Sequence, residues 1–185
     1  MAPKRVSKGA CQQVVMENPD LTTLPIPKTW PQDGGPFITL PLVVTKDPVS
    51  GEQNLGMYRS QIYGPTECGL HWQMHKHGAD HADASLGSVN KIPVAICLGG
   101  PPELIFSAIS PLPDNLSEFM FASFLANQRL KLVKATTQDL WVPAEADVPA
   151  VPAVADVPDV PAVPGLPNPE EPAVPAVLLD NISSQ

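Results

Sequence analysis

The part of this 185-residue chain after Asp147 limits the folded region more than any other feature of the sequence. Residues 148–185 repeat a Val-Pro-Ala or Val-Pro-Asp unit, contain nine prolines between Pro149 and Pro175, and hold no aromatic residue. Proline lacks the backbone N–H and fixes φ, so this repeat is expected to form neither a helix nor a ladder of strands. The pattern predicts a disordered or polyproline II tail. It is either a ligand for a proline-binding module or a solvated extension without a specific partner.

The charge is unevenly distributed along the chain. All eleven Lys and Arg lie at or before Lys134, together with eleven of the nineteen Asp and Glu, so this part is formally neutral. The remaining eight acids, from Asp139 to Asp180, account for the net charge of −8. The acidic balance therefore describes the end of the chain and not a folded surface. Because no patch of Lys and Arg is interleaved with aromatics, we expect no nucleic-acid partner.

Three cysteines, Cys11, Cys68 and Cys97, lie far apart and form no C-x-x-C pair. Their odd number argues against a disulfide framework and favours a reducing compartment, in which they are buried small apolar residues. The basic N-terminus is not followed by an apolar segment, so we expect no secretory signal, and no run of eighteen apolar residues predicts a transmembrane span. The sequence predicts a cytoplasmic protein.

Between the N-terminal region and the tail, strand-like and helix-like patterns are mixed. In chain order we expect strands at 36–47, 55–64 and 67–76, one or two helical turns within 77–90, a buried strand at 91–100, helices after Pro101 and Asn115, and two strands within 129–146. The first two strands flank a turn-like segment and predict a hairpin. This mixture, with short connections, predicts the α+β class.

All four histidines fall within eleven residues, in the pattern H-x3-H-x-H-x3-H formed by His71, His75, His77 and His81. Histidines four positions apart share one helix face, and neutral imidazole suits zinc or copper. Gly78 interrupts the helical pattern, however, and a strand gives the first two histidines no fixed helical geometry. A self-contained metal site, a surface cluster, and a site that uses one or two of these histidines all remain open.

Asn54 and Arg59 flank the strand-like string NLGMYR. An asparagine carbonyl is a hard oxygen ligand, and a guanidinium binds phosphate or carboxylate through two parallel hydrogen bonds. A turn asparagine and a surface arginine are the alternative interpretation. The residues by themselves therefore indicate an α+β domain with a metal or anion site.

Four strings, in this order and spacing, resemble the middle domain of UbiD-family decarboxylases, near the 3-polyprenyl-4-hydroxybenzoate carboxy-lyase branch. They are DGGPFITLPLVVTKDPVSGEQNLGMYRSQIY, GLHWQMHKHGADH, IPVAICLGGPPELIFSAISPLP and LVKATTQDLWVPAEAD. The resemblance implies a split β-barrel of flavin-reductase type with a few flanking helices, incomplete in this chain. It divides the chain into an N-terminal extension (1–23), a cofactor-binding domain (24–147) and the Pro-rich tail (148–185).

The resemblance also implies an activity and its cofactors. The family decarboxylates aromatic or α,β-unsaturated carboxylic acids reversibly, in quinone biosynthesis or aromatic acid metabolism. It uses prenylated FMN, a divalent metal (usually manganese) that bridges the cofactor phosphate to the protein, and often potassium. Full-length members are expected to be homo-oligomers.

Matching this chain to the family's motifs assigns roles to individual residues. Metal binding falls on Asn54, His75 and Asp147. Arg59 is the expected catalytic residue, because it also faces the substrate carboxylate. The expected cofactor contacts are Met57, Tyr58, Arg59, His71, Trp72, Gln73, Lys76 and His77.

The chain departs from the family pattern at three places. Asp147 stands where the family has a glutamate and is one methylene shorter, and His77 stands where the family usually has glycine. The strand that follows in the family is replaced by the Val-Pro repeat, which predicts an open sheet edge and self-association. The family's proton-donating acids and N-terminal α/β domain have no counterpart here. The alternative function is therefore a non-catalytic remnant that at most binds flavin and metal.

Overall fold

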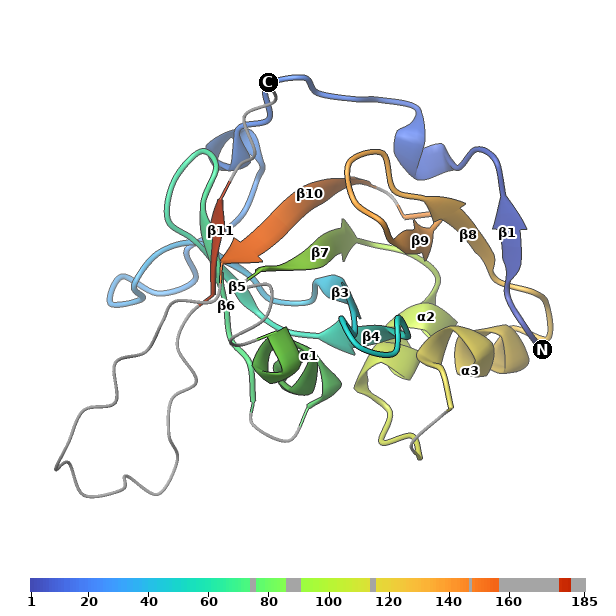
Figure 1. Cartoon of the computed structure of the whole chain (residues 1–185). Coiled ribbons are helices and arrows are strands. Elements are labelled where there is room, and N and C mark those ends of the chain that lie inside the picture. Colours follow the sequence, from blue (N-terminus) through green and yellow to red (C-terminus); the bar gives the residue numbers. More distant parts are fainter. Residues whose placement is uncertain (74–75, 86–90, 114–115, 147, 157–176, 181–185) are drawn as a thin grey trace, which may run out of the picture.

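The computed structural model describes residues 1–73, 76–85, 91–113, 116–146, 148–156 and 177–180 (Figure 1). Within these residues, three α-helices, α1 (His77–Ser85), α2 (Pro102–Ile109) and α3 (Glu118–Leu125), accompany two sheets and two short 3-10 turns, η1 (Ala10–Gln12) and η2 (Leu21–Thr23). The smaller sheet places β8 (Lys131–Lys134) between β1 (Lys4–Val6) and β9 (Trp141–Pro143). The larger sheet contains, in spatial order, β2 (Phe37–Ile38), β5 (Ser60–Ile62), β6 (Cys68–Leu70), β11 (Val177–Asp180), β10 (Val148–Asp156), β7 (Lys91–Leu98), β3 (Leu42–Lys46) and β4 (Gln53–Met57).

The mixture of helices and mainly antiparallel strands agrees with the predicted class. Every strand pair is antiparallel except β1 with β8. Within the described residues the larger sheet is open, since it ends at β2 and β4 and does not close into a barrel. The expected helices after Pro101 and near residue 118 are present, and the expected strand at 67–76 is reduced to β6.

The predicted hairpin is formed by β3 and β4. Its turn is held by Asp47, whose carboxylate accepts a hydrogen bond from the backbone N–H of Val49 and whose backbone oxygen accepts one from Gly51. Gly51 has φ of 75°, a conformation that favours glycine. The resulting register places Thr45 opposite Asn54, so these two side chains lie on the same face of the sheet.

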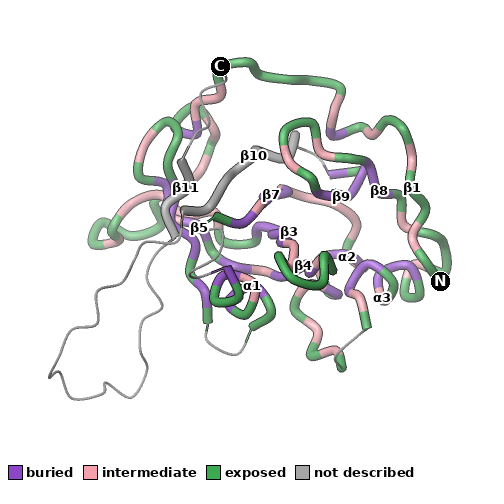
Figure 2. Tube along the Cα trace, viewed as in Figure 1, coloured by how far each residue is buried: buried purple, intermediate pink, exposed green. Residues whose placement is uncertain are grey.

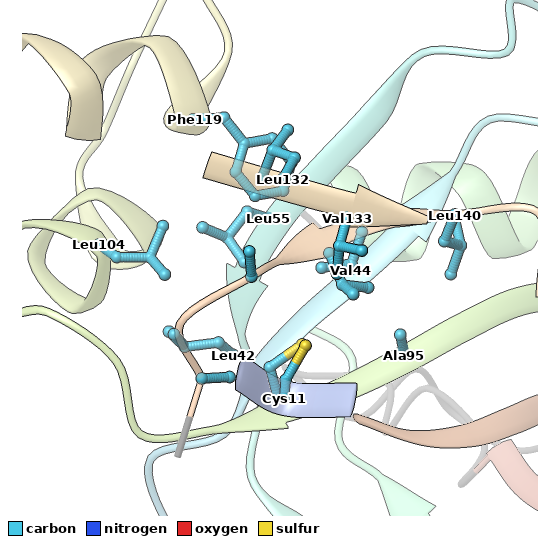
Figure 3. Packing of buried hydrophobic residues seen from close by; sticks show 14 of the residues in the cluster. Cys11, Leu42, Val44, Leu55, Ala95, Leu104, Phe119, Leu132, Val133 and Leu140 are labelled. Carbon is cyan, nitrogen blue, oxygen red and sulfur yellow. The ribbon is translucent and has the colours of Figure 1, made fainter. Parts of the chain in front are cut away.

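Strands β3 and β7 are buried on both faces, which explains their continuous apolar sequences (Figure 2). Successive side chains alternate between two hydrophobic clusters. Val43 and Val94 join the cluster that includes Trp72 and residues of α1. Val44 and Ala95 join the second cluster, which includes residues of α2, α3 and the smaller sheet (Figure 3).

The three cysteines behave as the sequence predicts. All are buried and free, and burial raises the pKa of Cys68 and of Cys97 to about 12. A thiol with so high a pKa is not a nucleophile at neutral pH. Within the described residues, no helix is both long and apolar enough to cross a membrane.

The segment after Asp147 differs from expectation. β10 pairs antiparallel with β7, from Asp156 opposite Lys91 to Val148 opposite Leu98, with a β-bulge on the way. The prediction that this region forms no ladder is therefore wrong for Val148–Asp156, and the open edge expected there is occupied (Figure 1).

Two features of β10 explain why its prolines are tolerated. β11 pairs only with the last three residues of β10. Among the described residues, most of the outer edge of β10 therefore faces no neighbouring strand, so the N–H groups that prolines lack are not required there as hydrogen-bond donors. The register shift between Val148 and Val151 lies at the first of the prolines, and bulges and edges are where sheets accept proline. Residues 157–176 and 181–185 lie outside the described part, so the disordered tail remains a prediction there.

Candidate functional site

A cavity of about 690 Å³ opens beside β4, α1, α3 and the smaller sheet. Two of its lining side chains are polar and nearly buried, namely Asn54 at 6% and Glu118 at 7% exposure. His77 and His81, one turn apart on α1, also line it. At its more exposed side lie Arg5, Lys46, Lys134, Asp139 and Trp141.

Asn54 presents an oxygen donor to this cavity. Its side-chain nitrogen Nδ2 donates to the Tyr58 hydroxyl at 3.4 Å, and the backbone N–H of Gly78 donates to the same hydroxyl at 3.1 Å. Burial raises the pKa of Tyr58, so the phenol stays neutral. Because the amide nitrogen is engaged, the amide oxygen is the atom of Asn54 left to bind a ligand.

Glu118 is the first residue of α3 and reaches the edge strand β4. Its Oε2 accepts a hydrogen bond from the backbone N–H of Leu55 at 3.3 Å, at the residue next to Asn54. Burial raises the pKa of the Glu118 carboxyl, and nearby His77 opposes that rise. A buried carboxylate in a cavity favours a cationic ligand.

His81 is held in place by Thr45. Its Nδ1 lies 2.9 Å from the hydroxyl of Thr45, the fully buried residue that stands opposite Asn54 in the hairpin. Burial of the imidazole lowers the pKa of His81. The ring is therefore neutral near pH 7 and fixed in orientation by Thr45.

We expect His81 to make the protein less stable in mild acid. Because the pKa of His81 is lower in the folded chain than its unfolded value of about 6.5, the unfolded chain takes up the proton first as pH falls. Stability from this group is present above pH 6.5 and is lost below it. Melting at pH 7.5 and pH 5.5 should show a smaller acid-induced drop in Tm for His81→Gln than for the unmodified chain. His71→Gln, at an exposed position, is the control; equal drops in all three proteins would contradict the prediction.

The exposed side of the cavity is rich in cations. Asp139 is bound by Lys46 at 2.5 Å and by Lys134, and these hydrogen bonds lower the pKa of Asp139 to about 2. The guanidinium of Arg5 lies 4.6 Å from the centre of the Trp141 ring, and the ammonium of Lys134 lies 5.6 Å from it. The exposed residue Glu52 also lines the cavity, so three cations face two carboxylates and this group is net positive, which suits a phosphate.

The residues assigned by resemblance differ in their relation to the cavity. Asn54 and His77 line it. Arg59 and His71 are exposed and are not among its lining residues, and the backbone N–H of His71 donates to the Arg59 carbonyl. The Arg59 guanidinium lies 5.7 Å from the centre of the Phe37 ring.

The remaining assigned residues differ in their burial and contacts. Trp72 is buried, with its ring edge-to-face on Tyr58 at 4.7 Å, and Met57 packs against the second hydrophobic cluster. Gln73 and Lys76 are exposed in one turn. His75 and Asp147 lie outside the described residues. Within the described part, no three His, Cys, Asp or Glu side chains are placed to hold a metal, so a self-contained histidine site has no support there.

Sequence reasoning did not single out Glu118, Thr45 or the cluster of Lys46, Lys134 and Asp139. Glu118 lies in a segment for which the spacing of apolar residues predicted a helix and nothing more. Its hydrogen bond with the Leu55 N–H of β4 joins residues 63 positions apart. Thr45, Lys46, Lys134 and Asp139 lie inside the strings that carry the family resemblance, whereas Glu118 lies between the third and the fourth string.

Comparison with known proteins decides the lineage. The model of the family described as "3-octaprenyl-4-hydroxybenzoate carboxy-lyase Rift-related domain" matches residues 4–149. The chain belongs to the UbiD family. This confirms the resemblance stated from the sequence.

Relatives of this UbiD-family chain are longer than the chain itself. An uncharacterized protein of Archaeoglobus fulgidus is 48% identical over 148 residues, and one of Aquifex aeolicus is 42% identical over 147 residues. Each alignment covers 79% of this chain and 30% of the relative. The chain thus spans about a third of the length of these relatives.

Solved UbiD-class structures share the fold. The enzyme HmfF from Pelotomaculum thermopropionicum, in complex with FMN, superposes with a TM-score of 0.79 at 26% identity and covers 96% of this chain and 41% of that chain. Vanillic acid decarboxylase of Sedimentibacter hydroxybenzoicus gives a TM-score of 0.78 at 26% identity and covers 83% of this chain and 34% of that chain.

Proposed function

We propose that this UbiD-family chain binds prenylated FMN and a divalent cation, manganese by resemblance, as part of a carboxy-lyase. The observation that supports this most is the Asn54 side chain, whose nitrogen is engaged by Tyr58 and whose oxygen is left for a ligand. The related HmfF structures contain FMN in one case and prenylated FMN in another.

The side chains around the cavity fit such a cation. Asn54 and Glu118 offer oxygen donors, and His77, which also lines the cavity, offers imidazole nitrogen. Manganese accepts carboxylate, carbonyl and imidazole ligands. The Glu118 carboxylate is nearly buried, and a cation bound in the cavity would add positive charge beside it.

The exposed side of the cavity fits a phosphate. Arg5, Lys46 and Lys134 bring three cations to it, and Asp139 neutralises only part of their charge. Arg5, Lys46 and Lys134 would hold a phosphate here by balancing its charge. This charge distribution supports the proposal that the phosphate end of the flavin binds at the cavity.

Arg59 is the residue we propose for the substrate carboxylate. It is exposed next to His71, and its guanidinium can form two parallel hydrogen bonds with a carboxylate. Such a pair orients an aromatic or α,β-unsaturated acid, and orientation is a large part of what a protein contributes to a decarboxylation. Prenylated FMN, when bound, supplies the electron sink for the reaction.

Replacing Asn54 with alanine should abolish cofactor binding. The change removes the amide oxygen, and we expect manganese affinity to fall by at least about 100-fold, more than the loss seen for indirect contacts to a metal ligand. Absorbance titration with prenylated FMN and manganese, together with thermal shift, measures both. Asn54→Asp keeps an oxygen donor at the same position and should retain manganese binding.

Three results would separate the possible functions. Saturable binding that Asn54→Ala loses and Asn54→Asp keeps supports the proposed site. No binding by a chain that melts cooperatively rejects it. Binding without turnover of any aromatic acid favours the second candidate, a non-catalytic flavin- and metal-binding remnant.

A further inference from the structure

We propose that Gln53 is a positioning residue, which holds Asn54 at a fixed separation from the cations gathered around Trp141. The inference rests on the proposed function, because it concerns how that site keeps its two halves in place. It follows from the hydrogen bonds that join the edges of the two sheets and from the groups that each edge carries.

The side-chain amide of Gln53 binds the backbone of Trp141 at two points. Its Nε2 donates to the Trp141 carbonyl at 2.9 Å, and its Oε1 accepts from the Trp141 N–H at 2.9 Å. Both hydrogen bonds are partly buried. An amide that donates and accepts in this way takes the place of a peptide group on a neighbouring strand. Gln53 therefore pairs with β9 as a strand would, although it is a side chain of β4.

Trp141 requires such a partner because of its place in the smaller sheet. β9 is the last strand of that sheet, and Trp141 stands opposite Lys134 of β8. The next hydrogen bond along the two chains comes from neighbouring residues, since the Ala135 N–H donates to the Leu140 carbonyl. Successive residues of an antiparallel strand direct their N–H and C=O groups to opposite sides, so those of Trp141 point away from β8. Gln53 satisfies both groups, which would be costly to leave unpaired.

This pair of hydrogen bonds joins the two halves of the candidate site. On β4, Gln53 directly precedes Asn54, whose amide oxygen is the proposed metal ligand. On β9, the ring of Trp141 lies against the guanidinium of Arg5 and the ammonium of Lys134. The position of the proposed metal relative to the proposed phosphate therefore depends on how firmly β4 is held against β9.

A second polar contact between the hairpin and this region is weaker. Lys46 of β3 binds Asp139, whose side chain is 67% exposed, and an exposed ion pair contributes little. The partly buried pair of hydrogen bonds from Gln53 is thus the better candidate for fixing β4 against β9.

Gln53→Ala should uncouple the binding of the two ligands. The attraction between bound manganese and the phosphate of FMN depends on their separation, and a rigid link means that little of it is offset by the cost of ordering the strands. In the unmodified chain we expect saturating FMN to tighten manganese binding by at least about tenfold. In Gln53→Ala, manganese alone should bind nearly as well, but FMN should leave its affinity almost unchanged. Calorimetric titration of manganese with and without FMN measures this coupling.

Gln12→Ala is the matched control. The side chain of Gln12 also donates to a backbone carbonyl of the smaller sheet, that of Lys134 at 2.8 Å, but it comes from η1 and does not line the cavity. This variant loses a comparable hydrogen bond and should keep the coupling. A purely structural role of Gln53 would lower the Tm of both variants and leave the coupling intact in both.

The outcomes distinguish this inference from the proposed function. If the unmodified chain binds neither manganese nor FMN, the proposed function fails and the inference with it. If it binds both, the inference alone is overturned by any of three results: no coupling in the unmodified chain, full coupling in Gln53→Ala, or equal loss of coupling in Gln12→Ala.

Hydrogen exchange of the unmodified chain tests the link without any substitution, and so decides the matter if the variant does not fold. Manganese and FMN together should slow exchange of the Trp141 amide. The Ala144 amide, which donates to the Lys131 carbonyl within the smaller sheet, should be nearly unaffected. No slowing at Trp141, or equal slowing at both amides, would overturn the inference.

Discussion

Replacing Trp72 with alanine should lower the free energy of unfolding by about 3 kcal/mol. Trp72 is 1% exposed, packs edge-to-face on Tyr58, and fills the space over Gly78, where an added Cβ would lie 2.4 Å from the indole. Truncating a buried tryptophan costs about 3–5 kcal/mol. We expect the lower end, because the buried indole N–H has no hydrogen-bond partner among the described residues and its removal relieves a small penalty.

Urea unfolding monitored by circular dichroism measures this loss, and Trp30→Ala is its control. Trp30 is 67% exposed, so the same substitution should change stability by less than about 0.5 kcal/mol. The Trp72 variant should also bind manganese more weakly, since Tyr58 loses the ring that fixes its hydroxyl beside Asn54. A Trp72 variant as stable as the Trp30 variant would show that this cluster does not support the fold.

Ending the chain at Asp147 should destabilise the fold strongly and cause self-association. β10 pairs with β7 over most of that strand, and β7 is at the centre of both hydrophobic clusters. Removing β10 leaves a row of unpaired N–H and C=O groups on a buried strand, each net hydrogen bond being worth about 1 kcal/mol. The total is a large share of the 5–15 kcal/mol that stabilises a typical domain.

A chain that ends at Asp156 is the comparison, because it keeps β10. We expect the longer chain to melt at the higher temperature and to elute as the smaller species on size-exclusion chromatography over a range of concentrations. Identical melting and elution of the two truncated chains would mean that β10 adds nothing to the sheet, and would restore the expectation of an unpaired tail.

The sequence determined the elements whose signal is local. The hairpin of β3 and β4 follows from two β-branched runs around a turn that Asp47 and Gly51 can form, and β7 follows from an apolar run of strand length. The burial of the three cysteines follows from their chemistry. The family followed from four strings in a particular order and spacing. No single helix or strand would have identified it.

Other features depended on contacts between residues far apart in the chain. The Val-Pro segment forms a strand because it pairs with the edge of β7. Its prolines are tolerated because few backbone donors are required along the outer edge of β10. His81 was set apart from the other histidines by Thr45, which lies 36 residues earlier. Glu118 was placed beside Asn54 by the packing of α3 on β4.

The sequence by itself therefore determined the family, the main strands and helices, and Asn54 as a candidate ligand. The tertiary structure decided which side chains share one cavity with Asn54, and Arg59 is not among the residues that line it. The physical reason is that periodicity and turn chemistry act over a few residues. The surroundings of a charged group are set by whichever distant segments pack against it.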